Sequence, residues 1–224
     1  MRLVVIISLL IGMNTFAQTT KAVYSFKIEK SPVTGSTSLA DQANPLAEEN
    51  EFFLLFDTKY SYYSSEKTES RRPDLSDALA GSYYPVKYNF QERKFEYNAE
   101  FDKLYCVKEG NIPEWEVTAE TKNISGYECV KAIGKLKNVN NPDKHTIIEA
   151  WFAPELPYRT GPNMFVNLPG LVVYAVDRNQ YIYKLERIKF NDNNKDLNNI
   201  KMKGTVINQQ EYADMLNEEN EKWK

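Results

Sequence analysis

The chain has few of the residues from which most catalytic and metal sites are built. It contains one histidine, His145, and two cysteines, Cys106 and Cys129, among 224 residues. A zinc tetrad needs four such ligands. A catalytic histidine needs an orienting carboxylate, for which Asp143 is the local candidate, and a nucleophile, yet no Gly-x-Ser-x-Gly elbow is present. The sequence therefore predicts no metal, no cofactor and no catalytic residue, and a hydrolase or metal-dependent enzyme is the least favoured alternative.

Long apolar runs are also rare, and the clearest one lies at the N-terminus. Arg2 precedes an apolar run from Leu3 to Met13, and Thr15-Phe-Ala17 is a small-x-small cleavage site before Gln18. The run is too short to span a bilayer. We therefore expect a secretory signal peptide at residues 1–17, with an uncleaved membrane anchor as the alternative.

The mature chain, residues 18–224, is expected to form one domain without a transmembrane segment. A signal peptide directs it out of the cytoplasm, to the periplasm, the outer membrane or the medium. The sequence has 28 Lys and Arg against 31 Asp and Glu, interspersed and without a basic block. This pattern argues against nucleic acid and against an anionic membrane surface as partners.

The two cysteines would meet oxidising conditions after export. A disulfide between Cys106 and Cys129 is the natural expectation in such a compartment. Two buried free thiols are the alternative, because a sequence does not show the pairing geometry that a disulfide requires.

Aromatic residues make up 13% of the chain, including 15 tyrosines, which favours a β-rich fold. Residues 31–50 read as a long loop with one helical turn at 46–49, opened by Pro45. A short helix is expected at 74–80, and an amphipathic helix at 208–223 with Tyr212, Met215, Leu216 and Trp223 on one stripe. Strands are expected at 22–30, 51–57, 59–64, 86–90, 94–97, 103–108, 116–120 and 127–136, the last near the sheet centre.

The chain is organised around residues 146–190. Strands are expected at 146–152, 171–176 and 181–190, and the segment between the first two holds four prolines. Proline fixes φ and donates no hydrogen bond, so this segment is neither helix nor central strand. Because it is also apolar, we expect it to fold onto the sheet and cover it.

Six side chains of this stretch could line a pocket for a hydrophobic ligand, because such pockets are mostly apolar. The alternative is that they pack the core, as buried apolar residues usually do. These candidate ligand-binding residues are Trp151, Tyr158, Met164, Phe165, Leu168 and Tyr174.

The same stretch resembles the signature of the GLPGLI family. The resemblance lies in Ala150-Trp-Phe152, Pro154, Pro157, Gly161-Pro162 and the motif Asn167-Leu168-Pro169-Gly170-Leu171-Val172. Asn167 stands where the family has its first glycine and Val172 where it has the final isoleucine. Ser125–Ala132 also resembles the family pattern. The resemblance implies an exported protein of the kind found chiefly in Bacteroidota, for which no biochemical role is established.

These observations predict a mainly β fold, a strongly curved antiparallel sheet or open barrel with a C-terminal helix. Such a fold is similar to the periplasmic lipoprotein carriers, although fold alone does not give function. We expect a non-enzymatic envelope protein that binds a hydrophobic ligand or another envelope protein. The alternative is an interaction module, with residues 59–64, including Tyr62 and Tyr63, as a docking edge.

Overall fold

Strands are the main regular structure of the described chain. The computed structural model describes residues 18–29, 38–67, 72–138, 141, 143–192 and 195–222, so the expected signal peptide at 1–17 and Trp223 lie outside it. The strands are β1 (Thr20–Ile28), β2 (Phe52–Phe56), β3 (Tyr60–Ser65), β4 (Val86–Asn89), β5 (Lys94–Glu100), β6 (Leu104–Lys108), β7 (Glu114–Ile124), β8 (Tyr127–Lys137), β9 (His145–Ala153), β10 (Leu171–Asp177), β11 (Tyr181–Lys189) and β12 (Thr205–Asn208). The helices are α1 (Leu39–Glu48), α3 (Leu75–Leu79), the 3₁₀ turn η1 (Leu197–Asn199) and α4 (Gln209–Lys222).

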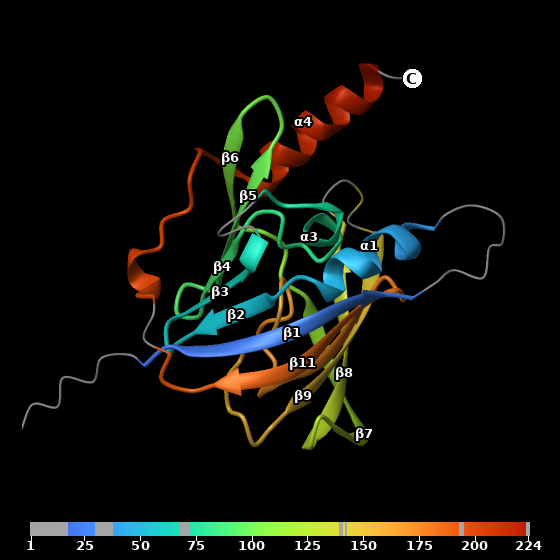
Figure 1. The fold of residues 1–224 in the computed structure, drawn as a ribbon. Helices are drawn as coiled ribbons and strands as arrows, with labels where there is room; N and C mark the ends of the chain where they lie inside the picture. Colours follow the sequence, from blue (N-terminus) through green and yellow to red (C-terminus); the bar gives the residue numbers. More distant parts are fainter. Residues whose placement is uncertain are drawn as a thin grey trace, which may run out of the picture.

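The sheet consists of two antiparallel meanders joined at their ends. Strands β1 to β6 pair in sequence order, as do β7 to β11, and β11 pairs with β1, so that one 12-stranded sheet results. Strand β12 adds to the outer side of β6 in parallel. Figure 1 shows β1 and β11 side by side across the molecule, with α1 next to β1.

A short link forces this sheet to curve. Strands β6 and β7 lie near opposite ends of the strand order, yet only residues 109–113 connect them. Six Cα steps span at most about 22 Å. The two ends of the sheet must therefore come close, and the sheet bends into a barrel that stays open. The prediction of a mainly β fold with a curved or open-barrel sheet and a C-terminal helix is confirmed.

The proline-containing segment 154–170 lies against the sheet, as its composition predicted. Phe165 is 0% exposed and Leu168 is 1% exposed, and both belong to the main hydrophobic core. Alternation in β1 directs Tyr24, Phe26 and Ile28 into this same core, whereas Ser25 and Lys27 are exposed. The interior of the open barrel is thus filled to a large extent by the protein's own side chains.

Strand β2 is buried along its whole length. Phe52, Leu54 and Phe56 enter the main core, while Phe53 and Leu55 form a second apolar cluster around Leu197 of η1. Lys87 holds this covering segment in place, because its Nζ donates to the carbonyl oxygens of Leu197 at 2.9 Å and of Ile200 at 2.7 Å.

The sequence predicted a long loop with a single helical turn that Pro45 opens. This prediction was wrong, because helix α1 is longer and spans Leu39–Glu48. The helix begins at Leu39 because Ser38 and Asp41 form a capping box, and Pro45 lies inside it. Three alanines, Ala40, Ala43 and Ala47, are buried along one side. Packing of this small face against the fold outweighs the cost of the internal proline.

The predicted docking edge at residues 59–64 is wrong. Strand β3 lies between β2 and β4 and pairs with both, so it has no free edge. Tyr62 is 4% exposed and Tyr63 1% exposed. The strand at 127–136 was also expected near the sheet centre, but β8 lies next to the terminal strand β7.

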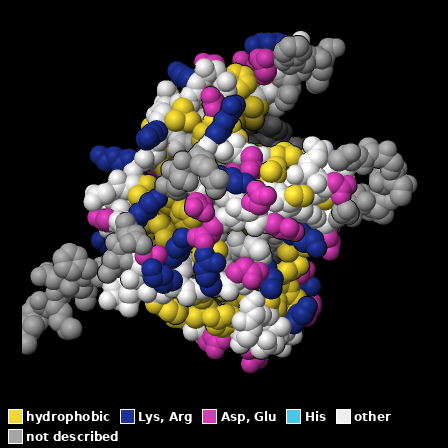
Figure 2. Space-filling view, in the orientation of Figure 1, with side chains coloured by type: hydrophobic (Ala, Val, Ile, Leu, Met, Phe, Trp, Pro, Cys, Tyr) yellow, Lys and Arg dark blue, Asp and Glu magenta, His cyan; other side chains and the backbone are white. Residues whose placement is uncertain are grey.

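Helix α4 confirms the predicted C-terminal helix. Its Tyr212 and Met215 pack against Ala99, Tyr105 and Val107 of β5 and β6. The sequence did not predict β12, which leads into this helix and pairs with β6. No helix in the described part of the chain is long and apolar enough to cross a membrane. On the face seen in Figure 2, lysine and arginine side chains are mixed with acidic ones.

The expected disulfide is not present. Cys106 on β6 and Cys129 on β8 are both free and both buried. The two cysteines lie on strands that do not pair with each other, because β6 pairs with β5 and β12, and β8 pairs with β7 and β9. Burial raises the pKa of the Cys106 thiol, and raises the pKa of the Cys129 thiol to about 11. Both cysteines are therefore core thiols of low reactivity.

Candidate functional site

The six candidate ligand-binding residues belong to the main hydrophobic core or pack against it, and they do not line one pocket together. Trp151 and Tyr174 are register partners on β9 and β10, so they share one face of the sheet. The indole Nε1 of Trp151 donates to Glu149 Oε1 at 2.7 Å, and Lys131 Nζ lies 5.7 Å from the Trp151 ring centre. Charged side chains border this pair, but Trp151 is buried in the main hydrophobic core and the half-buried Tyr174 packs against that core.

Three other candidates contribute to the interior packing. Phe165 lies between Trp115, with ring centres 6.1 Å apart, and Tyr183, at 5.7 Å. Leu168 is buried in the same core, and the half-buried Tyr158 meets the ring of Phe56 at 4.8 Å. Met164 differs from these five candidates, because it lines an open cleft of the molecule.

The motif at 167–172 has a structural explanation. Asn167 has a φ of 72°, the left-handed region that glycine and asparagine tolerate best, so asparagine can stand in for the family's glycine. Its Oδ1 accepts a hydrogen bond from the Tyr88 hydroxyl at 3.0 Å. At Gly170 a Cβ atom would come within 2.3 Å of the Ala153 carbonyl oxygen. The motif therefore fixes how the segment returns to the sheet.

The cleft that Met164 lines lies where the barrel stays open, and we call it the seam cleft. It has a volume of about 400 Å³. Its walls come from β4 and β5 of the first meander, from the end of β8, from the tip of segment 154–170 and from the start of α4. Its aromatic lining consists of Tyr83, Tyr84, Phe95 and Tyr97. Its amide lining consists of Asn98, Asn111, Asn163 and Gln209.

Hydrogen bonds hold several of these side chains in position. The Tyr97 hydroxyl donates to Gln209 Oε1 at 2.9 Å, which ties β5 to the first residue of α4. Burial raises the pKa of Tyr97 to about 12, so the hydroxyl stays protonated at neutral pH and can donate this bond. Asn111 Nδ2 donates to the Lys137 carbonyl oxygen at 2.7 Å, and Tyr84 donates to Glu100.

The charged group in the seam cleft lining is the guanidinium of Arg178. Arg178 Nε lies 3.5 Å from Oδ2 of Asp177, and its Cζ lies 5.6 Å from the Tyr181 ring centre. Asp177 is 4% exposed, and its Oδ1 has no hydrogen-bond partner among the described residues. Burial raises the pKa of this carboxyl group, and the neighbouring Arg178 charge offsets part of that rise.

A second hollow adjoins the seam cleft and shares Asn111 and Gln209 with it. This adjoining hollow has a volume of about 470 Å³. It is lined mainly by amide side chains, with one acidic and one basic residue. Its further lining residues are Glu109, Lys137, Asn138, Asn208 and Gln210.

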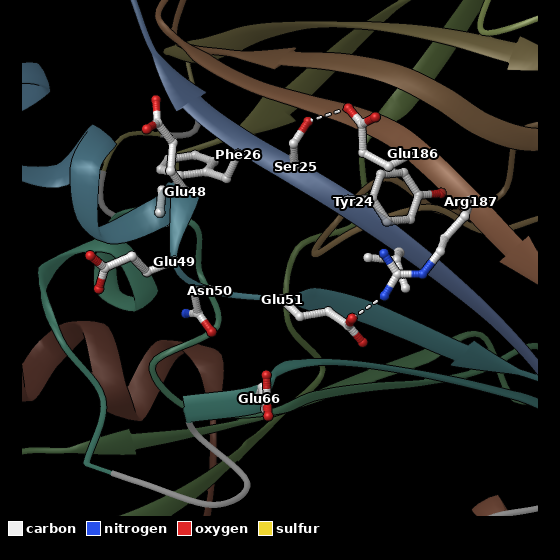
Figure 3. Close-up of a pocket in the computed structure, with 12 residues that line it drawn as sticks. Tyr24, Ser25, Phe26, Glu48, Glu49, Asn50, Glu51, Glu66, Glu186 and Arg187 are labelled. Carbon is white, nitrogen blue, oxygen red and sulfur yellow. Dashed lines mark hydrogen bonds and ion pairs between the residues drawn. The ribbon is translucent and has the colours of Figure 1, made fainter.

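An acidic hollow lies elsewhere, beside the C-terminal end of α1. Figure 3 shows five glutamates around it, with Arg187 reaching across to Glu51. Burial alone would raise the pKa of Glu51, but the hydrogen bond and charge of Lys21, together with Arg187, hold it below its usual value. The hollow therefore contains an ion-pair cluster that links β1, β2 and β11. The glutamates are Glu48, Glu49, Glu51, Glu66 and Glu186.

His145, considered and set aside as a base in the sequence, is exposed at the first position of β9. Its register partner is Lys137 of β8. Across the described ranges, no group of three or more His, Cys, Asp and Glu side chains is placed to hold a metal ion. Sequence reasoning missed most of the seam cleft. The adjacent Tyr83 and Tyr84, outside any predicted strand, were the one signal that could have indicated it.

Comparison with known proteins adds a family model and a fold. Residues 135–174 match a family model described as "Protein of unknown function (Porph_ging)". That span begins in β8, contains β9 and the motif, and ends within β10. The match agrees with the family resemblance of this stretch but does not fix a family name for the whole chain. No curated protein matches the chain.

Solved structures of PNGF-II in two crystal forms, P21 and C2, share the fold. Each has a TM-score of 0.59, with 19% and 18% identity respectively, and covers 89% of this chain. The chain spans about a third of PNGF-II, since the match covers 33% of that protein. At this identity the likeness shows the fold alone.

Proposed function

We propose that this chain is a non-enzymatic binding protein of the bacterial envelope, of the GLPGLI type, that holds a ligand in the seam cleft. Export rests on the signal-peptide pattern at residues 1–17. The observation that carries the binding role is the seam cleft itself. It is an open hollow of about 400 Å³ whose lining includes four aromatic side chains. The interior of the barrel is otherwise packed by the protein's own side chains.

The chemistry of the lining favours binding over turnover. Its described residues are aromatic, apolar and amide side chains with one guanidinium. Such groups provide contact area and hydrogen bonds, and burial raises the pKa of the Tyr84 and Tyr97 hydroxyls, which keeps both protonated at neutral pH and unsuited to act as bases. The sequence predicted a hydrophobic ligand among six residues of the stretch 146–190, and we now propose the seam cleft as its site, where Met164 and the tyrosines supply the apolar contact.

Native mass spectrometry of the full chain, purified from its own envelope, tests this proposal. We expect a bound mass in the wild-type protein that is lost in a Tyr84→Ala, Tyr97→Ala double variant. The matched control is Tyr174→Ala, which removes a half-buried tyrosine that does not line the seam cleft. Circular dichroism shows whether each variant is folded.

Two results would overturn the proposal. One is a wild-type protein without any bound mass, since the seam cleft would then have no ligand to hold. The other is a bound mass that is unchanged in the double variant and lost in Tyr174→Ala. If a protein co-purifies and no small mass is bound, the partner is an envelope protein and not a small ligand.

A further inference from the structure

We infer that the seam cleft and the adjoining hollow together bind a neutral saccharide of more than one ring. This inference rests on the proposed binding function and names the class of its ligand. The two hollows share Asn111 and Gln209, so one molecule could extend from one into the other. The aromatic side chains of the lining suit the apolar face of a sugar ring, and the amide side chains suit its hydroxyl groups.

The aromatic part of the groove fits the apolar faces of sugar rings. The Tyr83 and Tyr84 ring centres lie 4.9 Å apart in an edge-to-face arrangement, and the Phe95 and Tyr97 ring centres on β5 lie 6.3 Å apart. Carbon-bound hydrogens on one side of a pyranose carry slight positive charge. They are attracted to the negative face of an aromatic ring, while tyrosine hydroxyls keep a polar edge.

The amide part fits the hydroxyl groups. Each amide side chain both donates and accepts hydrogen bonds, as each sugar hydroxyl does. Asn138, Asn208 and Gln210 add three amides beyond the seam cleft. These three side chains are exposed, and a sugar brings hydroxyl groups that such amides can bind, whereas an alkyl chain brings none.

The junction of the two hollows presents a donor and an acceptor already held in place. Gln209 Oε1 accepts from Tyr97 at 2.9 Å, which directs its Nε2 group elsewhere as a donor. Asn111 Nδ2 donates to the Lys137 carbonyl oxygen at 2.7 Å, which leaves its Oδ1 as an acceptor. A side chain fixed before binding loses less freedom when the ligand arrives. This arrangement suits hydroxyls on neighbouring carbons.

The charge of the groove favours a neutral sugar over an acidic one. The seam cleft contributes Arg178, and the adjoining hollow contributes Glu109 and Lys137. The acidic and basic groups of the adjoining hollow balance each other. A uronic acid or phosphorylated sugar would need more positive charge than the single remaining guanidinium to compensate its desolvation.

Isothermal titration of the full chain tests the inference with four probes: chitotriose, mannotriose, maltotriose and cellotriose. We expect at least one of them to bind. Gln209→Ala and Asn111→Ala should each weaken that binding about ten-fold, the loss of one hydrogen bond of about 1.4 kcal/mol. Gln42→Ala is the matched control, because this glutamine is exposed on α1, far along the chain from the groove.

A second measurement uses the wild-type protein alone, so the inference can be tested even if either variant fails to fold. In an NMR titration, the side-chain amide signals of Asn111 and Gln209 should shift with the sugar, and that of Gln42 should not. If none of the four sugars binds, or if these signals stay still, the inference is wrong. A lipid or peptide mass lost in the tyrosine double variant would also refute it, while leaving the proposed binding function intact.

Discussion

The hydroxyl of Tyr24 on β1 donates a hydrogen bond of 2.7 Å to the main-chain oxygen of Val172 on β10. The register of β9 and β10 shifts between Val172 and Tyr174, so the ladder is interrupted there. Tyr24 is 1% exposed, and burial raises the pKa of its hydroxyl well above the ordinary value. The first strand of the chain thus satisfies a carbonyl group at the end of the family motif.

Removing this hydroxyl should destabilise the fold. Tyr24→Phe keeps the ring but leaves the buried Val172 oxygen without its donor, and we expect a loss of about 2 kcal/mol in the free energy of unfolding. Urea denaturation followed by fluorescence measures it. Tyr158→Phe is the control, because that half-buried tyrosine does not contact the Val172 carbonyl. Equal losses in the two variants would contradict the assigned role of Tyr24.

Gly170 should tolerate no side chain. A Cβ atom there would meet the carbonyl oxygen of Ala153 at 2.3 Å and its carbon at 2.7 Å, both of them backbone atoms that cannot rotate away. We expect Gly170→Ala to lower the free energy of unfolding by about 2 kcal/mol or more. Gly126→Ala is the comparison, because no atom lies within 4 Å of its Cβ position and only its φ of +90° is unfavourable. A smaller loss at Gly170 than at Gly126 would show that the close approach is not limiting.

Acid should weaken the fold partly through Glu51. Its pKa in the folded protein is lower than the ordinary value of 4.5, because Lys21 and Arg187 outweigh the effect of burial. A lowered folded-state pKa contributes stability above the unfolded-state pKa, and this stability is lost as the pH falls through the folded-state pKa. Urea midpoints at about pH 7 and about pH 3 should therefore differ more in the wild type than in Glu51→Gln. Glu48→Gln, at an exposed position, should behave like the wild type.

Asp177 should show the opposite dependence on pH. Burial raises its folded-state pKa, so the charged form is penalised at neutral pH and the penalty is relieved as the pH falls through the raised pKa. Asp177→Asn should raise the melting temperature near neutral pH, and this gain should shrink on mild acidification. Thermal unfolding followed by circular dichroism measures both, with the exposed Asp214→Asn as control. A lower melting temperature in Asp177→Asn at neutral pH would refute this reading.

The two cysteines should behave as separate, protected thiols. Without reductant, denatured protein should take up two alkyl groups, and the mass should be the same after prior reduction. The native protein should react slowly, because burial raises the pKa of Cys129 to about 11 and also that of Cys106. Mass spectrometry of iodoacetamide-treated samples tests this. If the mass increases only after reduction, the two cysteines form a disulfide.

The strands were predictable because their signal is local. Alternation of Tyr24, Phe26 and Ile28 with polar neighbours is visible in nine residues, and the structure follows it. Helix α1 was missed because Ala, Asn, Gln and an internal proline resemble a loop in composition. The helix is stabilised by small side chains that pack against the rest of the fold, and the sequence of the segment alone does not predict that contact.

The seam cleft could not be read from the sequence for a topological reason. Its walls come from residues as distant as Tyr83, Leu136 and Gln209, which meet only because the 109–113 link brings the sheet ends together. Trp151 and Phe165 were grouped as pocket residues because they are aromatic and close in sequence. Trp151 is placed by the register of β9, whereas Phe165 is placed by the non-regular segment 154–170, and both side chains pack in the core.

The junction between the two meanders also has a consequence for how the chain acquires its structure. Lys21 pairs with Lys189, so the contact that unites the sheet joins positions from nearly opposite ends of the polypeptide. High contact order of this kind slows folding, since distant segments must meet before either gains from the encounter. Each half can form local hairpins early, but the two meanders cannot join before β11 is present.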